Sequence, residues 1–130
     1  MAIKTRTFSD LDLMFAPHPA TKDITRKYDE NAIKFSLKNL ILTANYERPF
    51  HSEIGSPIRK LLFELPSPIF NITLQRAISD VITNFEPRVE LIDVYVNDRV
   101  DENAVDVTIE FKIINTEQPL TLELLLERTR

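Results

Sequence analysis

The first part of the chain lacks regular hydrophobic spacing, and a helical pattern follows it. Residues 1–28 fit no clean period, so we expect an irregular N-terminal arm whose apolar residues fold back on the domain core or dock on a partner. From Asp29, a reasonable N-cap, helical spacing predicts a first helix. Phe35 and Leu42 form a second apolar line, covered by the chain's own core or by another chain. The main stripe is Ile33, Leu37, Leu40, Ile41 and Ala44.

Proline marks the start of two further helices. Gly55-Ser56-Pro57 predicts a turn, an N-cap and a first helical residue, opening a short helix to about Glu64. Ser67-Pro68 opens the longest amphipathic pattern, and Pro87 disfavours helical geometry at Glu86 and ends it there. Its apolar stripe consists of Phe70, Leu74, Ala77, Ile78, Val81, Ile82 and Phe85.

Beyond Pro87 the hydrophobic period changes from that of a helix to two. Alternation over residues 91–96, 105–113 and 120–127 predicts three half-buried strands. Residues 97–103 are polar and turn-prone, which favours a hairpin between the first two strands, and residues 115–119 turn the chain again.

These elements predict an α+β fold of three helices packed on a small, mainly antiparallel three-stranded sheet with open edges. We expect an arm over 1–28 and one domain over 29–130, with helices in 29–86 and the sheet in 89–127. The last strand, with Leu122, Leu124 and Leu126, has little of the charge or proline that blocks edge pairing. Either a strand from another chain adds there, or the N-terminal arm covers a short edge.

Composition narrows the class of protein without identifying it. The chain has 130 residues, is 43% hydrophobic and 28% charged, and carries a net charge of −4, which is typical of one globular domain and unfavourable for nucleic acid or an anionic membrane. It has no cysteine, which excludes a disulfide framework and a thiolate site. We find no signal peptide and no apolar run approaching the roughly 18 residues of a membrane span.

Few residues suit catalysis or metal binding. His18 and His51 have no second ligand at metal-binding spacing, and a single glycine rules out a glycine-rich phosphate loop, so we expect no metal and no cofactor. Glu47, Glu53 and Glu64 could supply the two carboxylates of a glycoside hydrolase, but their spacing is not distinctive and solvated carboxylates are the usual outcome.

Glu86-Pro87-Arg88 is the most unusual local feature, between the longest helix and the first strand. Proline fixes the corner, and the Arg88 guanidinium suits bidentate recognition of a carboxylate. A local Glu–Arg pair at a helix end would leave the same pattern, so both interpretations stay open.

Several segments together resemble a known family. They are Asn45-Tyr46-Glu47-Arg48-Pro49-Phe50, Glu53-Ile54-Gly55, Leu61-Leu62-Phe63-Glu64 and Asn84-Phe85-Glu86-Pro87-Arg88-Val89. In this order and spacing they resemble the GPW-type baseplate wedge family of contractile phage tails, from about Lys22 to the C-terminus. The family often has a glycine just before the Arg-Pro segment, where this chain has Tyr46 and Glu47, so the geometry of that turn is an open question.

The resemblance implies a structural subunit of the virion tail baseplate, assembled in the host cytoplasm, and no enzyme. Glu86, Pro87 and Arg88, with Arg48, Pro49, Phe50 and Gly55, would bind other wedge proteins that form a core helical bundle. The C-terminal sheet would initiate the tail sheath by accepting strands of sheath subunits beside Leu122, Leu124 and Leu126. Because some family members are described as lysozyme-like, a baseplate-associated peptidoglycan hydrolase is the alternative.

Overall fold

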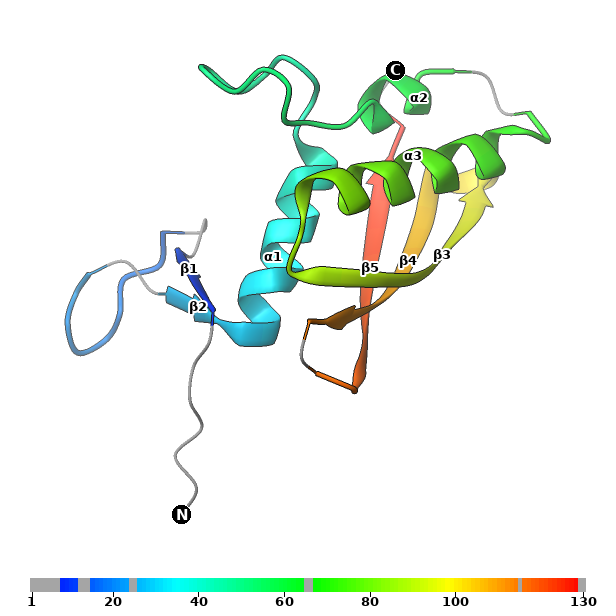
Figure 1. Ribbon diagram of the computed structural model, residues 1–130. Coiled ribbons are helices and arrows are strands. Elements are labelled where there is room, and N and C mark those ends of the chain that lie inside the picture. The colour runs from blue at the N-terminus through cyan, green and yellow to red at the C-terminus, as the bar shows by residue number, and fades with distance from the viewer. Residues whose placement is uncertain (1–7, 12–14, 24–25, 65–66, 115, 129–130) are drawn as a thin grey trace. The chain divides into compact units, whose positions relative to one another are not determined.

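The computed structural model describes residues 8–11, 15–23, 26–64, 67–114 and 116–128 (Figure 1). The chain divides into two compact units, residues 1–36 and residues 37–130. The predicted division into an arm over 1–28 and a domain over 29–130 stays a prediction.

The first unit contains a small antiparallel sheet of two short strands, β1 (Ser9–Leu11) and β2 (Arg26–Tyr28). The main-chain N–H of Asp29 extends this pairing by donating to the Phe8 carbonyl at 2.8 Å. The expectation that all of residues 1–28 are irregular is therefore wrong for these strands. Three residues are too few to display a period of two, so the sequence carries no signal for them.

Helix α1 (Asp29–Leu42) begins where the sequence predicts and ends slightly earlier than expected. Asp29 has a left-handed φ of 47°, so its backbone marks the entry into the helix. In the C-terminal half of α1, Leu37 and Ile41 are buried, whereas Leu42 is 49% exposed. The second apolar line predicted on this helix is therefore open to solvent at Leu42.

Helix α2 (Ile58–Leu62) follows Pro57, but no side chain caps its start. Ser56 is buried and donates its hydroxyl to the Ile41 carbonyl at 2.5 Å, while its N–H donates to the Thr43 carbonyl at 2.9 Å. Carbonyls at a helix C-terminus have no partner within the helix. The predicted N-cap role of Ser56 is therefore wrong, because this residue satisfies the end of α1 instead.

Helix α3 (Phe70–Phe85) confirms the strongest helical pattern of the sequence. Its first N–H donates to the Ser67 carbonyl at 3.0 Å, and it ends at Glu86, whose φ of −122° and ψ of 85° are not helical. Pro87 follows and enforces that end. The buried residues of α3 are Phe70, Leu74, Ile78, Val81 and Ile82, all members of the predicted stripe.

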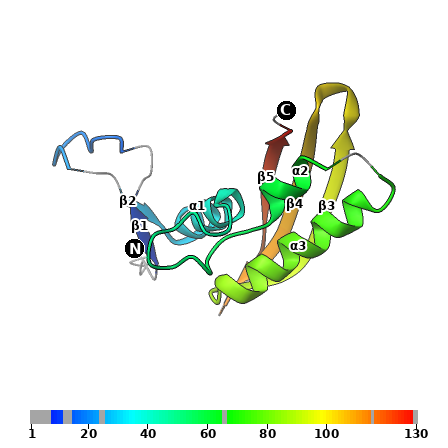
Figure 2. The same ribbon diagram turned by 90° about the horizontal axis from the view of Figure 1, so that it is seen from above.

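The second unit contains an antiparallel sheet with the order β3-β4-β5. Its strands are β3 (Val89–Arg99), β4 (Ala104–Ile113) and β5 (Pro119–Glu127). Helix α3 lies along one face of this sheet (Figure 2). The predicted fold class, α+β with three helices and an open three-stranded antiparallel sheet, is confirmed.

A β-bulge interrupts β3 and was not predicted. Leu91 pairs with Phe111 and Asp93 with Glu110, so Ile92 is the extra residue, and its side chain is 47% exposed. A bulge shifts the alternation by one residue. The inward residues of β3 are therefore odd-numbered before Ile92 and even-numbered after it, which the uniform alternation expected over 91–96 misses.

Strands β4 and β5 have no such irregularity, and their burial alternates as the sequence predicts. The side chains that face α3 pair across the two strands as Val105 with Leu126, Val107 with Leu124, Ile109 with Leu122 and Phe111 with Leu120. Most of these side chains are buried and belong to the core of the unit. Aliphatic and aromatic pairs across neighbouring strands stabilise the sheet on this face.

Candidate interaction surfaces

The Glu86-Pro87-Arg88 corner forms an ion pair within the chain. The Arg88 Nε donates to Glu86 Oε1 at 2.7 Å, and Nη2 donates to Oε2 at 3.0 Å, a bidentate geometry. The Glu86 side chain is 4% exposed and that of Arg88 is 29% exposed. The structure thus contains the local pair that the sequence left as one interpretation, with the Arg88 side chain partly accessible to solvent.

The loop between α1 and α2 places Arg48, Pro49, Phe50 and Gly55 on a hydrogen-bonded scaffold. The Glu47 carboxylate accepts the N–H of Ala44 at 2.8 Å, which closes the first turn of the loop. A Cβ atom on Gly55 would lie 2.6 Å from the Ala44 carbonyl oxygen, far inside contact distance. Glycine is therefore required where the two ends of the loop pass each other.

The tip of this loop exposes two aromatic side chains. Tyr46 is 83% exposed, Phe50 is fully exposed, and both have left-handed φ values, of 66° and 67°. Such a conformation costs a residue with a Cβ roughly 1–2 kcal/mol. Tyr46 therefore adopts backbone geometry that favours glycine, at the position where the sequence left the turn open. Arg48 and Pro49, between the two aromatic residues, are also exposed.

The three candidate catalytic carboxylates have individual local roles. The Glu47 carboxylate binds the Ala44 N–H, and Glu53 lies 3.3 Å from the His51 Nδ1. Backbone hydrogen bonding, followed by the contact with His51, lowers the pKa of Glu53. A general acid needs a raised pKa, so Glu53 is perturbed in the wrong direction for that role. Glu64 is exposed.

Both histidines take part in local contacts. His18 Nδ1 accepts the N–H groups of Ala20 at 3.2 Å and Thr21 at 3.3 Å, and His51 contacts Glu53. Among the described residues, no group of three His, Cys, Asp or Glu side chains could hold a metal ion.

Strand β5 forms one edge of the sheet, and the hydrogen-bond pattern identifies its outward groups. Arg128 donates its N–H to the Asn103 carbonyl at 2.9 Å, which makes these two residues a hydrogen-bonded pair in register with the strands. Because antiparallel pairs alternate, even-numbered residues of β5 bond to β4 and odd-numbered residues direct their N–H and C=O groups to the open edge. These outward residues are Pro119, Thr121, Glu123, Leu125 and Glu127.

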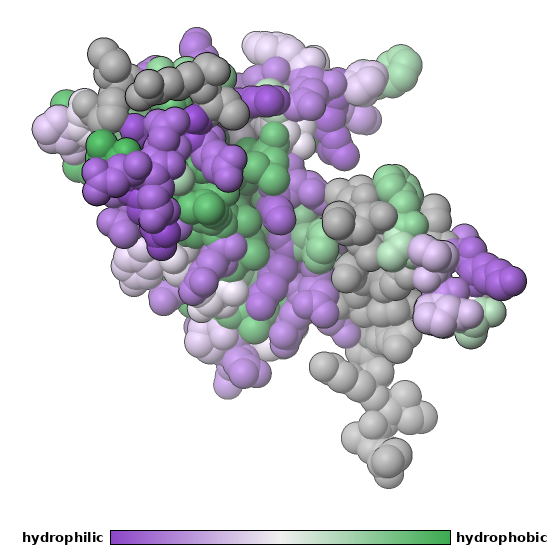
Figure 3. Space-filling view, turned by 180° about the vertical axis from the view of Figure 1, so that it is seen from behind, coloured by the Kyte–Doolittle hydropathy of each residue, from purple (hydrophilic) through white to green (hydrophobic). Residues whose placement is uncertain are grey.

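Figure 3 views the molecule from the side of the sheet opposite α3, where hydrophilic surface encloses patches of hydrophobic surface. On that face Arg99 pairs with Asp106, and the nearby Asp93 carboxylate, through hydrogen bonding and then its charge, raises the pKa of Tyr95. Acidic residues outnumber basic ones there. By strand register they are Glu90, Asp93, Asp106, Glu110, Glu123 and Glu127, against Arg99 and Lys112.

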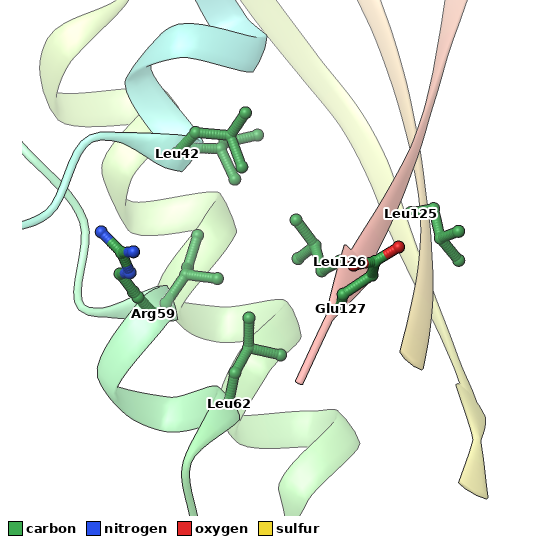
Figure 4. Close-up of a pocket in the computed structure, with 8 residues that line it drawn as sticks. Leu42, Arg59, Leu62, Leu125, Leu126 and Glu127 are labelled. Atoms are coloured by element: carbon green, nitrogen blue, oxygen red, sulfur yellow. The ribbon is translucent and has the colours of Figure 1, made fainter. Parts of the chain in front are cut away.

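A hollow of about 350 Å³ lies beside the C-terminal end of β5 (Figure 4). In the close-up, Leu42, Leu62 and Leu126 face the space between the helices and the strand, while Leu125 points to the other side of β5. The lining residues come from the end of α1, from α2 and from β5: Ile41, Leu42, Ile58, Arg59, Leu62, Leu125, Leu126 and Glu127. The hollow therefore adjoins the open edge.

Two features of this region were not predicted from the sequence. The hollow combines Leu42 with Leu62, which lie on different helices, and their places in two separate apolar patterns did not indicate that they share one hollow. The second is Arg128, which is buried, binds Asp98 Oδ2 at 2.9 Å and stacks 4.5 Å from the centre of the Phe70 ring. An arginine after the last strand carried no signal that it would be buried.

No helix within the described ranges is both long and apolar enough to cross a membrane.

The chain matches a family model described as baseplate wedge protein gp25 over residues 27–118. It is also 32% identical over 115 residues to the baseplate wedge protein gp25 of Enterobacteria phage T4, covering 88% of this chain and 86% of that protein.

Solved structures share the fold at low identity. A candidate tail lysozyme from Geobacter sulfurreducens has a TM-score of 0.70 and 21% identity, covering 75% of this chain and 89% of the other. A chain of the anti-feeding prophage baseplate has a TM-score of 0.64 and 17% identity, covering 95% of this chain and 87% of the other.

Proposed function

This chain belongs to the gp25 family of baseplate wedge proteins and is a component of the virion tail baseplate. We propose that it initiates the tail sheath by strand addition at β5. In this role it joins the core helical bundle of other wedge proteins through the Glu86-Pro87-Arg88 corner and the loop with Arg48, Pro49, Phe50 and Gly55. Sheath subunits then supply the added strand.

The observation that carries this proposal is the difference between the two edges of the sheet. The β3 edge contains the bulge at Ile92, and bulges obstruct edge-to-edge pairing. Strand β5 pairs with β4 without interruption from Pro119 to Glu127. Its only proline is the first residue, where the missing N–H would have pointed to the open edge. From Thr121 onward β5 therefore offers an unbroken row of main-chain groups.

Strand addition uses main-chain hydrogen bonds for affinity and side-chain contacts for specificity. Thr121, Glu123, Leu125 and Glu127 direct both main-chain groups outward, so an incoming strand can continue the sheet along most of β5. Leu122, Leu124 and Leu126 bond to β4 and face α3, and they hold the strand in place. These leucines thus support the edge from inside.

Glu123→Pro tests strand addition, with Leu124→Pro as the matched control. Glu123→Pro removes an outward donor from an exposed residue, so we expect little change in thermal stability and a failure to start sheath growth. Leu124→Pro breaks the β4–β5 ladder and removes a buried side chain, so we expect a loss of roughly 3 kcal/mol or more. The measurements are thermal unfolding and sheath polymerisation on baseplates assembled with each variant. Normal sheath growth with a folded Glu123→Pro protein would contradict strand addition.

We propose that the protein is not an enzyme, and the hydrolase alternative has a direct test. The purified chain should not clear cell-wall suspensions, and Glu47→Gln, Glu53→Gln and Glu64→Gln should not change that result. The lowered pKa of Glu53 is unfavourable for the general acid of such a pair, and the carboxylate of Glu47 is engaged by the Ala44 N–H. Clearing that one of these substitutions abolishes would establish the hydrolase and overturn the structural role as its sole function.

A further inference from the structure

We propose that the strand received by β5 has aliphatic side chains on the face toward α1 and α2, and basic side chains flanking an apolar one on the opposite face. This inference rests on the proposed strand addition and names the chemistry of the partner. The hollow beside β5 and the charges on the outward residues of the strand support it.

The hollow sets the first half of this pattern. A strand added to β5 continues the pleat, so every second side chain points to the side of β5 on which the C-terminal end of α1 and helix α2 line the hollow. There it meets Leu42, Leu62 and Leu126, which face the hollow (Figure 4). At about 350 Å³ the space is near the lower end of the roughly 300–1,000 Å³ typical of ligand pockets, and it accommodates side chains of a strand. Aliphatic residues are the matching chemistry.

The outward residues set the second half. Glu123, Leu125 and Glu127 alternate on the exposed face of β5, with the 54% exposed Leu125 in the centre. In the described part of the chain, no ion pair engages Glu123 or Glu127. Opposite charges on facing strands attract and like charges repel. A strand with a basic–apolar–basic pattern therefore complements this edge, whereas an acidic strand is rejected.

The same charges argue against a second copy of the chain as the occupant. Two β5 strands pairing antiparallel about Leu125 would place Glu123 of one copy opposite Glu127 of the other. Two such contacts form by symmetry, and each brings like charges together. Charged residues are a common protection of open edges against self-association. Here the protection is selective, because it leaves the edge open to a basic strand.

The experiment measures the binding of two nine-residue labelled peptides to the full chain by fluorescence anisotropy. Both alternate leucine on one face, and the other face carries Lys-Leu-Lys in one peptide and Glu-Leu-Glu in the other. We expect the lysine peptide to bind about tenfold tighter or more. A scrambled lysine peptide of equal charge, with the alternation broken, controls for general attraction to the chain's net charge of −4 and should bind at least tenfold more weakly.

Variants of the protein locate the effect. Glu123→Lys should shift the preference toward the glutamate peptide, while Asp80→Lys, the same charge change on the exposed side of α3, should leave it unchanged. Leu42→Asp should weaken both alternating peptides about tenfold, because the half-exposed Leu42 lines the hollow but is not in the core. Ile72→Asp, a similarly exposed position on α3, is its control and should have no effect.

The outcomes separate this inference from the proposed function. The inference is overturned if the glutamate peptide, or the scrambled peptide, binds as tightly as the alternating lysine peptide. Strand addition itself would stand in that case if Glu123→Pro still blocks sheath growth. If no peptide binds, the inference fails, and normal sheath growth with Glu123→Pro would then remove strand addition as well. Dimerisation of the isolated chain that Glu123→Pro abolishes would show a second copy to be the occupant and would also overturn the inference.

Discussion

At the scale of single residues, the motifs have local structural roles in addition to the partner contacts proposed for them. Gly55 lets the two ends of a loop pass at contact distance, and that loop exposes Tyr46 and Phe50. Glu86 and Arg88 pair with each other while Arg88 keeps part of its side chain accessible. A motif whose residues satisfy each other inside the chain can therefore still present a fixed surface to a wedge partner, because the internal pair holds the exposed group in position.

The Glu86–Arg88 pair requires that stability and assembly be measured separately. Arg88→Ala leaves a 4% exposed carboxylate without its guanidinium, and removing one partner of a buried pair costs roughly 3–5 kcal/mol. We expect a clear loss of thermal stability, which would by itself prevent incorporation into wedges. The double variant Glu86→Gln/Arg88→Gln removes both charges, and its free energy of unfolding should lie within about 2 kcal/mol of that of the natural chain. Wedge assembly assays with this folded variant should show loss of incorporation, and normal incorporation would place the charges of the corner outside the interface.

At the scale of secondary-structure elements, the two edges of the sheet differ although both strands alternate. The bulge at Ile92 bends β3 and breaks its row of main-chain groups, whereas β5 is regular along its length. Proline at the start of β5 faces outward and does not disturb the ladder. The β5 edge is therefore the regular one, and the proposed strand addition belongs there because one extra residue interrupts the other edge.

Deletion of Ile92 tests this role of the bulge. Without it, Leu91 and Asp93 become adjacent, and inward residues alternate correctly on both sides of the junction, so we expect the variant to fold within about 1 kcal/mol of the natural chain. Its β3 edge becomes regular, and we expect increased self-association in sedimentation experiments. Ile92→Ala keeps the extra residue and should stay at the natural oligomeric state. If the deletion variant folds and does not self-associate, the prediction is wrong, and the charged residues of β3 are enough to prevent self-association at this edge without the bulge.

At the scale of the whole second unit, Arg128 connects the end of β5 to two other elements. Its guanidinium binds Asp98 at the end of β3 and stacks on Phe70 at the start of α3. Asn103 holds the same residue through its carbonyl oxygen and through its side-chain amide, which donates to the Arg128 carbonyl at 2.6 Å. The strand that offers the open edge is therefore fixed at its C-terminal end.

Arg128→Ala should destabilise the unit by about 2–4 kcal/mol, because Asp98 loses its partner while its side chain is only 16% exposed. For a unit of this size each kcal/mol corresponds to roughly 4–8 °C in melting temperature, so thermal unfolding should show a large decrease. Arg76→Ala removes an exposed arginine from α3 and should change stability by no more than about 0.5 kcal/mol. Equal melting temperatures for the two variants would contradict the anchoring role of Arg128.

The sequence by itself determined the elements and the fold class, because burial of one face imposes a period that local spacing reveals. The stripe of α3, the alternation of β4 and β5, and the end of α3 just before Pro87 all follow from such local rules. The local pair of Glu86 with Arg88 was one of two interpretations that the sequence offered, and the structure contains it. Only the tertiary structure decided the hydrogen bonds of Ser56 to the end of α1, the bulge at Ile92 and the burial of Arg128. Each of these depends on which distant groups meet in space, and residue spacing along the chain carries no information about that.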